Sequence, residues 1–93
     1  MVRVRIQKII WSEFTKKHIK KHGVSVDEAE NVIHSDAYRL EGYSGRKILV
    51  NKVGKRILSV VVEMTGNKLV VVTARDADKQ ERQGFYEKTK NGS

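Results

Sequence analysis

The spacing of apolar and polar residues changes several times along the chain, and each change predicts a new element. Residues 2–6 alternate valine or isoleucine with arginine, which is the period-two pattern of a half-buried strand. Ile9, Ile10 and Trp11 break this alternation. The pattern therefore predicts a strand at the start of the sequence and a helix after it.

The first helix is predicted to begin at Ser12, whose side chain suits the N-cap position. Aromatic and histidine residues then recur mostly at steps of four along one face, and lysines occupy the other faces. The first face carries Trp11, Phe14, His18 and His22, and the lysines are Lys16, Lys17, Lys20 and Lys21. Gly23 ends this helix, because glycine tolerates the positive φ of a C′ residue.

A second helix is predicted from a capping box. Ser25 and Glu28 stand three residues apart, so each side chain can accept a hydrogen bond from the backbone N–H of the other. This signal predicts a helix over residues 26–34, and Gly42 and Gly45 mark a loop after it.

Three strands are predicted in the second half of the chain, at residues 47–51, 56–64 and 68–73. Gly54 marks the turn between the first two, and the glycine-asparagine pair at 66–67 suits a two-residue hairpin turn between the last two. The apolar runs of the last two strands are almost continuous. We therefore expect these strands at the centre of a sheet, with much of both faces covered.

A third helix is predicted after the last strand. Asp78 and Glu81 repeat the capping pattern, and the helix continues through Tyr86. Gly84 destabilises a helix interior by about 1 kcal/mol relative to alanine. We therefore expect a short helix, with residues 88–93 as a flexible tail.

The predicted order is strand, helix, helix, three strands and helix. Hairpins connect the later strands, which indicates an antiparallel sheet rather than a doubly wound parallel one. The expected fold class is α+β, an antiparallel sheet of about four strands with two N-terminal helices and a C-terminal helix. At 93 residues, the chain forms a single domain over residues 1–93.

Charge gives the first indication of function. Lysine and arginine total 19 against 11 acidic residues, which leaves a net charge of +8. A small domain with this charge favours an anionic partner, and RNA, DNA, an anionic membrane and an acidic protein all fit. The alternative is a basic surface that serves solubility alone.

Composition also indicates the cellular compartment in which the protein is expected. The chain has no cysteine, which excludes disulfides and thiolate metal sites and favours a reducing compartment. The opening segment lacks the long apolar core of a signal peptide, and no apolar run approaches the roughly 20 residues that span a bilayer. We expect a cytoplasmic protein without a membrane partner.

Few motifs for catalysis are present. His18 and His22 have the spacing of helical metal ligands, but the sequence offers no third ligand, so we expect no metal. The alternatives are packing against Trp11 and Phe14, contact with phosphate, or an acid–base role. The absence of a phosphate-binding loop and of a nucleophile elbow disfavours kinases and α/β-hydrolases.

Arg75 is the most informative basic residue. It ends an apolar strand just before the helix that carries Arg82 and Tyr86 four residues apart. A strand end beside a helix N-terminus is a favourable place for an anion, and two guanidinium groups can hold a phosphate bidentately. The alternative is an ion pair of Arg75 with a nearby carboxylate, Asp76, Asp78 or Glu81.

Three segments together resemble the BrnT-type toxins of type II toxin–antitoxin systems. They are WSEFTKKHIKKHGVSVDE from Trp11, GRKILVNKVGKRILSVVVE from Gly45, and VVVTARDADKQERQGFYE ending at Glu87. The resemblance covers nearly the whole chain, in the same order. The resemblance implies a RelE-like fold and a metal-independent endoribonuclease that needs no cofactor and inhibits translation by cleaving RNA. It also implies a BrnA-type antitoxin as partner. The complex of toxin and antitoxin would bind operator DNA and repress the operon.

The resulting hypothesis assigns roles to eleven residues. The catalytic set holds phosphate and transfers a proton, and comprises Arg75, Arg82, Glu81 and His22. The RNA-binding set comprises Lys17, Lys21, Arg46, Arg56, Trp11, Tyr86 and His18. Arg75→Ala is expected to abolish cleavage with little change in melting temperature. The alternative is a non-catalytic module that binds RNA, DNA or the antitoxin.

Overall fold

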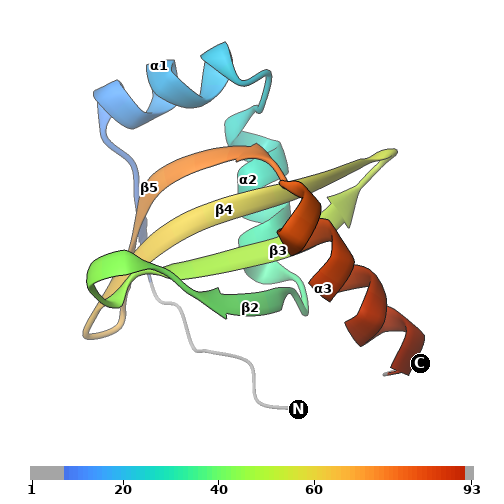
Figure 1. Ribbon diagram of the computed structural model, residues 1–93. Helices are drawn as coiled ribbons and strands as arrows, with labels where there is room; N and C mark the ends of the chain where they lie inside the picture. Colours follow the sequence, from blue (N-terminus) through green and yellow to red (C-terminus); the bar gives the residue numbers. More distant parts are fainter. Residues whose placement is uncertain (1–7, 92–93) are drawn as a thin grey trace.

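The structure, a computed structural model, describes residues 8–91, with side chains as far as residue 89. Figure 1 shows one sheet with α2 behind it, α1 above it beside β5, and α3 in front. In chain order the elements are β1 (Lys8–Ile10), α1 (Glu13–Lys21), α2 (Val26–His34), β2 (Tyr38–Glu41), the 3₁₀ turn η1 (Tyr43–Gly45), β3 (Lys47–Val53), β4 (Arg56–Thr65), β5 (Lys68–Asp76) and α3 (Lys79–Asn91).

The five strands lie in the order β1-β5-β4-β3-β2. The strands from β2 to β5 pair antiparallel with their neighbours, whereas β1 pairs parallel with β5. The predicted α+β class is confirmed. The prediction of about four antiparallel strands is wrong in detail, because the sheet has five described strands and is mixed.

Both missed strands are edge strands. The four residues of β2 fall in the segment predicted as a loop, and β1 falls where the chain was predicted to lead into a helix. Edge strands this short contain too few residues for a clear alternation of apolar and polar positions. In addition, Lys8 pairs with Lys68, which lies sixty positions further along the sequence. The strand predicted at residues 2–6 lies outside the described residues.

Local capping signals are confirmed. Ser12 Oγ accepts a hydrogen bond from Thr15 N at 3.0 Å. Ser25 and Glu28 make both hydrogen bonds of the capping box, and α2 spans the predicted residues. Gly23 follows the C-cap of α1 with a φ of 69°. These predictions held because a cap depends only on residues three or four positions apart.

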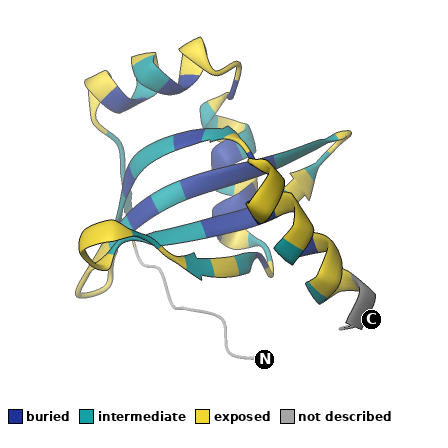
Figure 2. Cartoon of the chain, viewed as in Figure 1, coloured by how far each residue is buried: buried dark blue, intermediate teal, exposed yellow. Residues whose placement is uncertain are grey.

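The main core lies between the sheet and the two N-terminal helices (Figure 2). Ile19 of α1 and Ala29 and Val32 of α2 are buried there, at most 1% exposed. They pack against alternate side chains of the central strands, among them Leu58, Val60, Val62, Leu69 and Val71. We call this side of the sheet the helix face.

The opposite side of the sheet is covered only in part. Phe85 of α3 and Ala77 form a smaller core with Val50, and Tyr38 packs against it. Among the described residues, Figure 2 shows no helix across the rest of this side. The central position of β4 and β5 is confirmed, but only one of their faces is covered along its length. We call this second side the open face.

A β-bulge in β5 decides which residues reach the open face. Val61 pairs with Thr73, but the next residue, Val62, pairs with Val71. Val72 is therefore an extra residue in β5 without its own partner in β4. A bulge of this kind bends the strand and shifts the alternation of its side chains.

The bulge changes the face of the sheet on which the Arg75 side chain lies. Side chains of a regular strand alternate, so Arg75 would share a face with Leu69 and Val71, which lie in the main core. After the extra residue it is Ala74 that faces this core, fully buried. Arg75 is thereby directed to the open face.

The C-terminal helix is longer than predicted. It spans thirteen residues, so 88–91 are helical, and Lys88 Nζ donates to Ala37 O at 3.3 Å. Gly84 allows close packing, because a Cβ there would lie 2.5 Å from Tyr38 Oη and 2.8 Å from its ring. Within the described residues, no helix has the length and apolar character to cross a membrane.

Candidate RNA-binding site

Arg75 and Glu81 form the centre of the candidate site. Arg75 lies near the end of β5, and Glu81 lies in the first turn of α3. Arg75 Nη1 lies 2.7 Å from Glu81 Oε1, and Arg75 Nη2 lies 3.0 Å from Glu81 Oε2. This bidentate geometry fixes the plane of the guanidinium group as well as its position.

Glu81 is buried, with 4% of its surface exposed. Its Oε1 also accepts from Ser59 Oγ at 2.7 Å and from Asp78 N at 2.9 Å. Asp78 Oδ1 in turn accepts from Glu81 N at 2.8 Å, which completes the predicted capping pattern at the start of α3. One carboxylate therefore caps a helix, bonds the central strand and orients Arg75.

The electrostatics of this pair follow from its contacts. Burial alone would raise the pKa of Glu81, but hydrogen bonds from Arg75, from the Asp78 backbone and from Ser59 together hold it below its ordinary value. The hydrogen bond to Glu81 raises the pKa of Arg75, against the effect of burial. Both groups are therefore charged at neutral pH. The geometry favours a positioning role for Glu81 over the predicted proton transfer.

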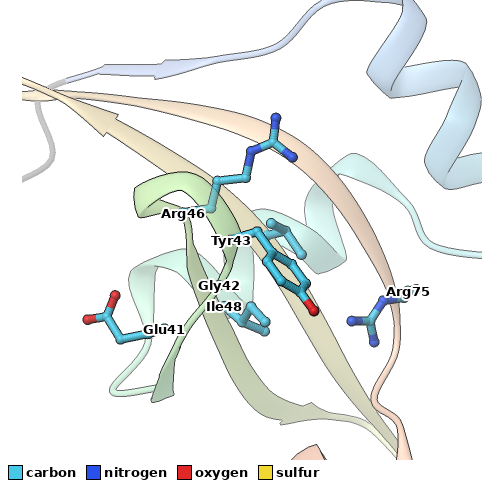
Figure 3. Close-up of a pocket in the computed structure, with 7 residues that line it drawn as sticks. Glu41, Gly42, Tyr43, Arg46, Ile48 and Arg75 are labelled. Carbon is cyan, nitrogen blue, oxygen red and sulfur yellow. The ribbon is translucent and has the colours of Figure 1, made fainter.

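Arg75 borders a pocket on the open face with a volume of about 440 Å³. Figure 3 shows the Arg75 side chain directed toward the turn between β2 and β3, with the Tyr43 side chain extending toward it. The residues that line the pocket are Glu41, Gly42, Tyr43, Arg46, Ile48, Val61 and Arg75. Two of the predicted site residues, Arg75 and Arg46, thus line the same pocket.

The turn η1 presents Tyr43 and Arg46 to this pocket. Ser44 and Gly45 both adopt positive φ, 57° and 75°, which turns the chain back sharply. Tyr43 is 92% exposed. Arg46 Nε lies 3.5 Å from Glu63 Oε1, an ion-pair contact without a hydrogen bond from Nε in the described residues. Arg46 is therefore held less firmly than Arg75.

Arg82 and Tyr86 do not join this pocket. Both are exposed on α3, and neither is among the residues that line the pocket. The Tyr86 and Phe85 rings meet edge to face, with centroids 5.8 Å apart. The predicted convergence of Arg75 and Arg82 on one anion is therefore not a feature of this pocket.

Arg56 has a structural role. Its guanidinium group donates to the carbonyl oxygens of His22 and Gly23, at the C-terminal end of α1, where cations stabilise a helix. Its Nε also lies 3.0 Å from Asp76 Oδ1. These contacts connect α1 to the ends of β4 and β5, and they occupy the group that was predicted to bind RNA.

The remaining predicted residues lie on or beside α1, whose buried side faces the helix face of the sheet. Phe14 is 76% exposed and stacks on His18, and the His18 and His22 rings meet edge to face. Lys17 and Lys21 are exposed. In the described part of the chain, no group of three or more histidine, aspartate or glutamate residues is placed to hold a metal.

Trp11 does not join the aromatic stack of α1. It is half-buried against the main core, and its Nε1 donates to Glu30 Oε2 of α2 at 2.9 Å. The sequence placed this residue in the RNA-binding set, whereas its contacts make it part of the packing around the main core.

The structure also changes one expectation about stability. Removing the Arg75 side chain would leave the buried Glu81 carboxylate without its cationic partner, and unpaired buried charges are strongly destabilising. We therefore expect Arg75→Ala to lower the melting temperature, contrary to the expectation from sequence.

Tyr43 is the aromatic residue of the pocket, and the sequence did not predict it as a site residue. Its segment was predicted as a loop from Gly42 and Gly45, and an aromatic residue between two glycines in a basic chain was the available signal. Ser59 was also missed, because a small polar residue inside the apolar run of β4 reads as part of the core. It is fully buried against Glu81.

A scan against protein-family models finds no match for the chain, and a search among curated proteins finds no similar sequence.

Proposed function

We propose that the chain binds RNA at the pocket of the open face and cleaves it as a metal-independent endoribonuclease of the BrnT toxin type, acting in the cytoplasm. The observation that carries this proposal is the position of Arg75. Its guanidinium group is oriented by a buried carboxylate, faces a pocket, and shares that pocket with Arg46 and Tyr43. A pre-oriented cation of this kind suits a phosphate.

The chemistry that fits this site is internal transfer of the RNA phosphate. The ribose 2′-oxygen attacks the adjacent phosphorus as its proton passes to a water molecule, and the 5′-oxygen departs with a proton supplied by a donor in the pocket, which gives a 2′,3′-cyclic phosphate and a 5′-hydroxyl. Arg75 would stabilise the charge that develops on the phosphoryl oxygens, usually the larger contribution. Tyr43 offers a hydroxyl at the same pocket as a proton donor.

Glu81 and His22 contribute less directly than the sequence suggested. All the hydrogen bonds that Glu81 accepts serve to hold Arg75, β4 and α3 in place, so it acts on the reaction by positioning Arg75. His22 is exposed at the end of α1 and does not line the pocket. Lys17 and Lys21, exposed on the same helix, would attract the RNA backbone without sequence preference.

An RNA cleavage assay tests the proposal. Arg75→Lys keeps the charge but loses the bidentate geometry, so it should lose most activity while remaining folded by circular dichroism. Arg39→Ala removes one cation from the opposite side of the sheet, since Arg39 is exposed and pairs with the core residue Leu49. This control should retain activity. Cleavage should also persist in excess EDTA, and full activity in Arg75→Lys would contradict the proposal.

A non-catalytic module that binds RNA or an antitoxin is the second candidate. The observation in its favour is that the carboxylates near the pocket are engaged, Glu81 with Arg75, Glu41 with Lys47 and Glu63 with Arg46. None of the three is a free base. RNA binding that depends on Arg75 in a protein that leaves every RNA intact would select this candidate.

The proposed protein partner is a BrnA-type antitoxin, with operator DNA bound only by the complex. The net charge of +8 suits an acidic partner segment, which would compete with RNA for the open face. Co-expression with a candidate antitoxin should protect RNA from cleavage. Cleavage that is equally fast in the purified complex would contradict this part of the proposal.

A further inference from the structure

The pairing of the strands fixes the layout of the pocket. Arg75 stands beside Ser59 of β4, and two positions further along β4, Val61 pairs with Ile48 of β3. Another two positions along β4, Glu63 contacts Arg46. The two arginines therefore lie at opposite ends of the pocket and on opposite sides of β4, with an offset along the strands of about four residues, or about 13 Å.

The floor between the two arginines is apolar. Ile48 and Val61 lie side by side there and both line the pocket, and neither is fully buried. Above this floor, Figure 3 shows the Tyr43 ring reaching from the turn η1 toward Arg75. Because Tyr43 is 92% exposed, almost all of its ring surface is free for contact with a ligand. The pocket thus combines an aromatic ring with an apolar floor.

The two cations differ in how firmly they are held. Arg75 makes two hydrogen bonds to a buried carboxylate. Arg46 makes one contact of 3.5 Å to Glu63, and both of these side chains are more than two-fifths exposed. A ligand phosphate at Arg75 would meet a fixed group, whereas Arg46 can leave Glu63 and move toward a second phosphate.

From this layout we infer that the pocket binds one unstacked nucleotide, with its base between the Tyr43 ring and the floor of Ile48 and Val61, and with the phosphates on its two sides held by Arg75 and Arg46. The inference rests on the proposed function and narrows its substrate to single-stranded RNA. In a duplex the bases are stacked and their faces are not available to an aromatic side chain.

Adenosine 3′,5′-bisphosphate is a suitable probe, because it carries one base with a phosphate on each side. A two-dimensional NMR titration would give its Kd and the residues that respond. We expect shifts at Tyr43, Ile48, Val61 and Arg75. Ribose 3,5-bisphosphate, which lacks the base, should bind at least about fivefold more weakly, as expected for loss of one stacking contact.

Variants separate the contributions of base and phosphate. Tyr43→Ala should raise the Kd of the adenosine probe by about fivefold or more and leave the Kd of the base-free probe unchanged, whereas Tyr43→Phe should bind both probes as the wild type does. Arg46→Ala should raise the Kd of both probes. Phe14→Ala, an exposed aromatic residue on α1, and Arg39→Ala are matched controls and should change neither Kd appreciably.

The failure of this inference can be distinguished from failure of the proposed function. In one outcome, RNA cleavage depends on Arg75 while Tyr43→Ala binds the adenosine probe with the Kd of the wild type and the base-free probe binds as tightly as the full nucleotide. In that case the base does not enter the pocket and the inference is wrong. Shifts confined to α1 would also overturn it. If the protein neither binds nor cleaves RNA, the proposed function and this inference are both wrong.

Discussion

Arg75 and Glu81 join strand β5 to helix α3 through two parallel contacts of 2.7 Å and 3.0 Å. The guanidinium group that borders the pocket is thus held by the same carboxylate that caps α3 and bonds Ser59 in the central strand. Stability and the candidate function therefore share one interaction. Variants at these two residues should affect both properties together.

Glu81→Gln tests this coupling. The amide is close in size to the carboxylate but weakens the charge-assisted hydrogen bonds, so we expect the free energy of unfolding to fall by about 1–3 kcal/mol. RNA cleavage should also fall, although Arg75 itself is intact, because its guanidinium group is no longer fixed. Urea denaturation and the cleavage assay measure the two effects. Glu87→Gln, at an exposed position of α3, is the matched control.

The pH dependence of stability gives a second test. The folded protein holds the pKa of Glu81 below its ordinary value of 4.5, the value expected in the unfolded chain. The resulting stabilisation is complete above that value and is lost as the pH falls through the lowered pKa. The difference in unfolding free energy between wild type and Glu81→Gln should therefore narrow below about pH 4.5. A difference that stays constant down to about pH 2.5 would contradict the role assigned to Glu81.

Gly84 offers a test of packing. Helix propensity alone predicts that Gly84→Ala stabilises by about 1 kcal/mol. The new Cβ would instead lie within 3 Å of the Tyr38 ring, so we expect a loss of about 1–3 kcal/mol. In a Tyr38→Ala background the same substitution should become stabilising. A double-mutant cycle by thermal unfolding measures this change of sign, and additive effects would exclude the contact.

The lysines of α1 should act through salt-dependent attraction. Lys17 and Lys21 are exposed, and each phosphate contact to single-stranded nucleic acid contributes about 0.7 to the slope of log Kd against log salt. Replacing both with alanine should therefore reduce this slope by about 1.4 without altering cleavage of saturating RNA. Replacing Lys52 and Lys55 near the turn between β3 and β4 gives a control of equal charge, and an equal loss there would show that only net charge matters.

The helices were more predictable from sequence than the sheet. The caps at Ser25 and Asp78 depend on partners three residues away, so the sequence contains the whole signal. The pairing of Lys8 with Lys68 depends on where the rest of the chain places β5. Gly84 was interpreted as destabilising α3. The Tyr38 ring, which leaves no room for a side chain at this position, lies 46 positions away in the sequence.

The candidate site was predictable in part. Arg75 was identified from its place between a strand and a helix, and phosphate binding was weighed against an ion pair with a carboxylate. The structure shows the ion pair, with Glu81, and places Arg75 beside the pocket. Phosphate binding there is the proposal. Tyr43 could not be placed, because the direction of its ring depends on the positive φ of Ser44 and Gly45.

The extra residue at Val72 has a consequence for protein engineering. Transfer of the Arg75–Glu81 pair to another scaffold would require the whole segment from Val71 to Glu81 as one block, since two matching side chains on a regular strand and helix would be out of phase. For the same reason, deletion of a single residue in this segment would do more harm than most substitutions there. The length of the segment, more than its composition, determines where the arginine points.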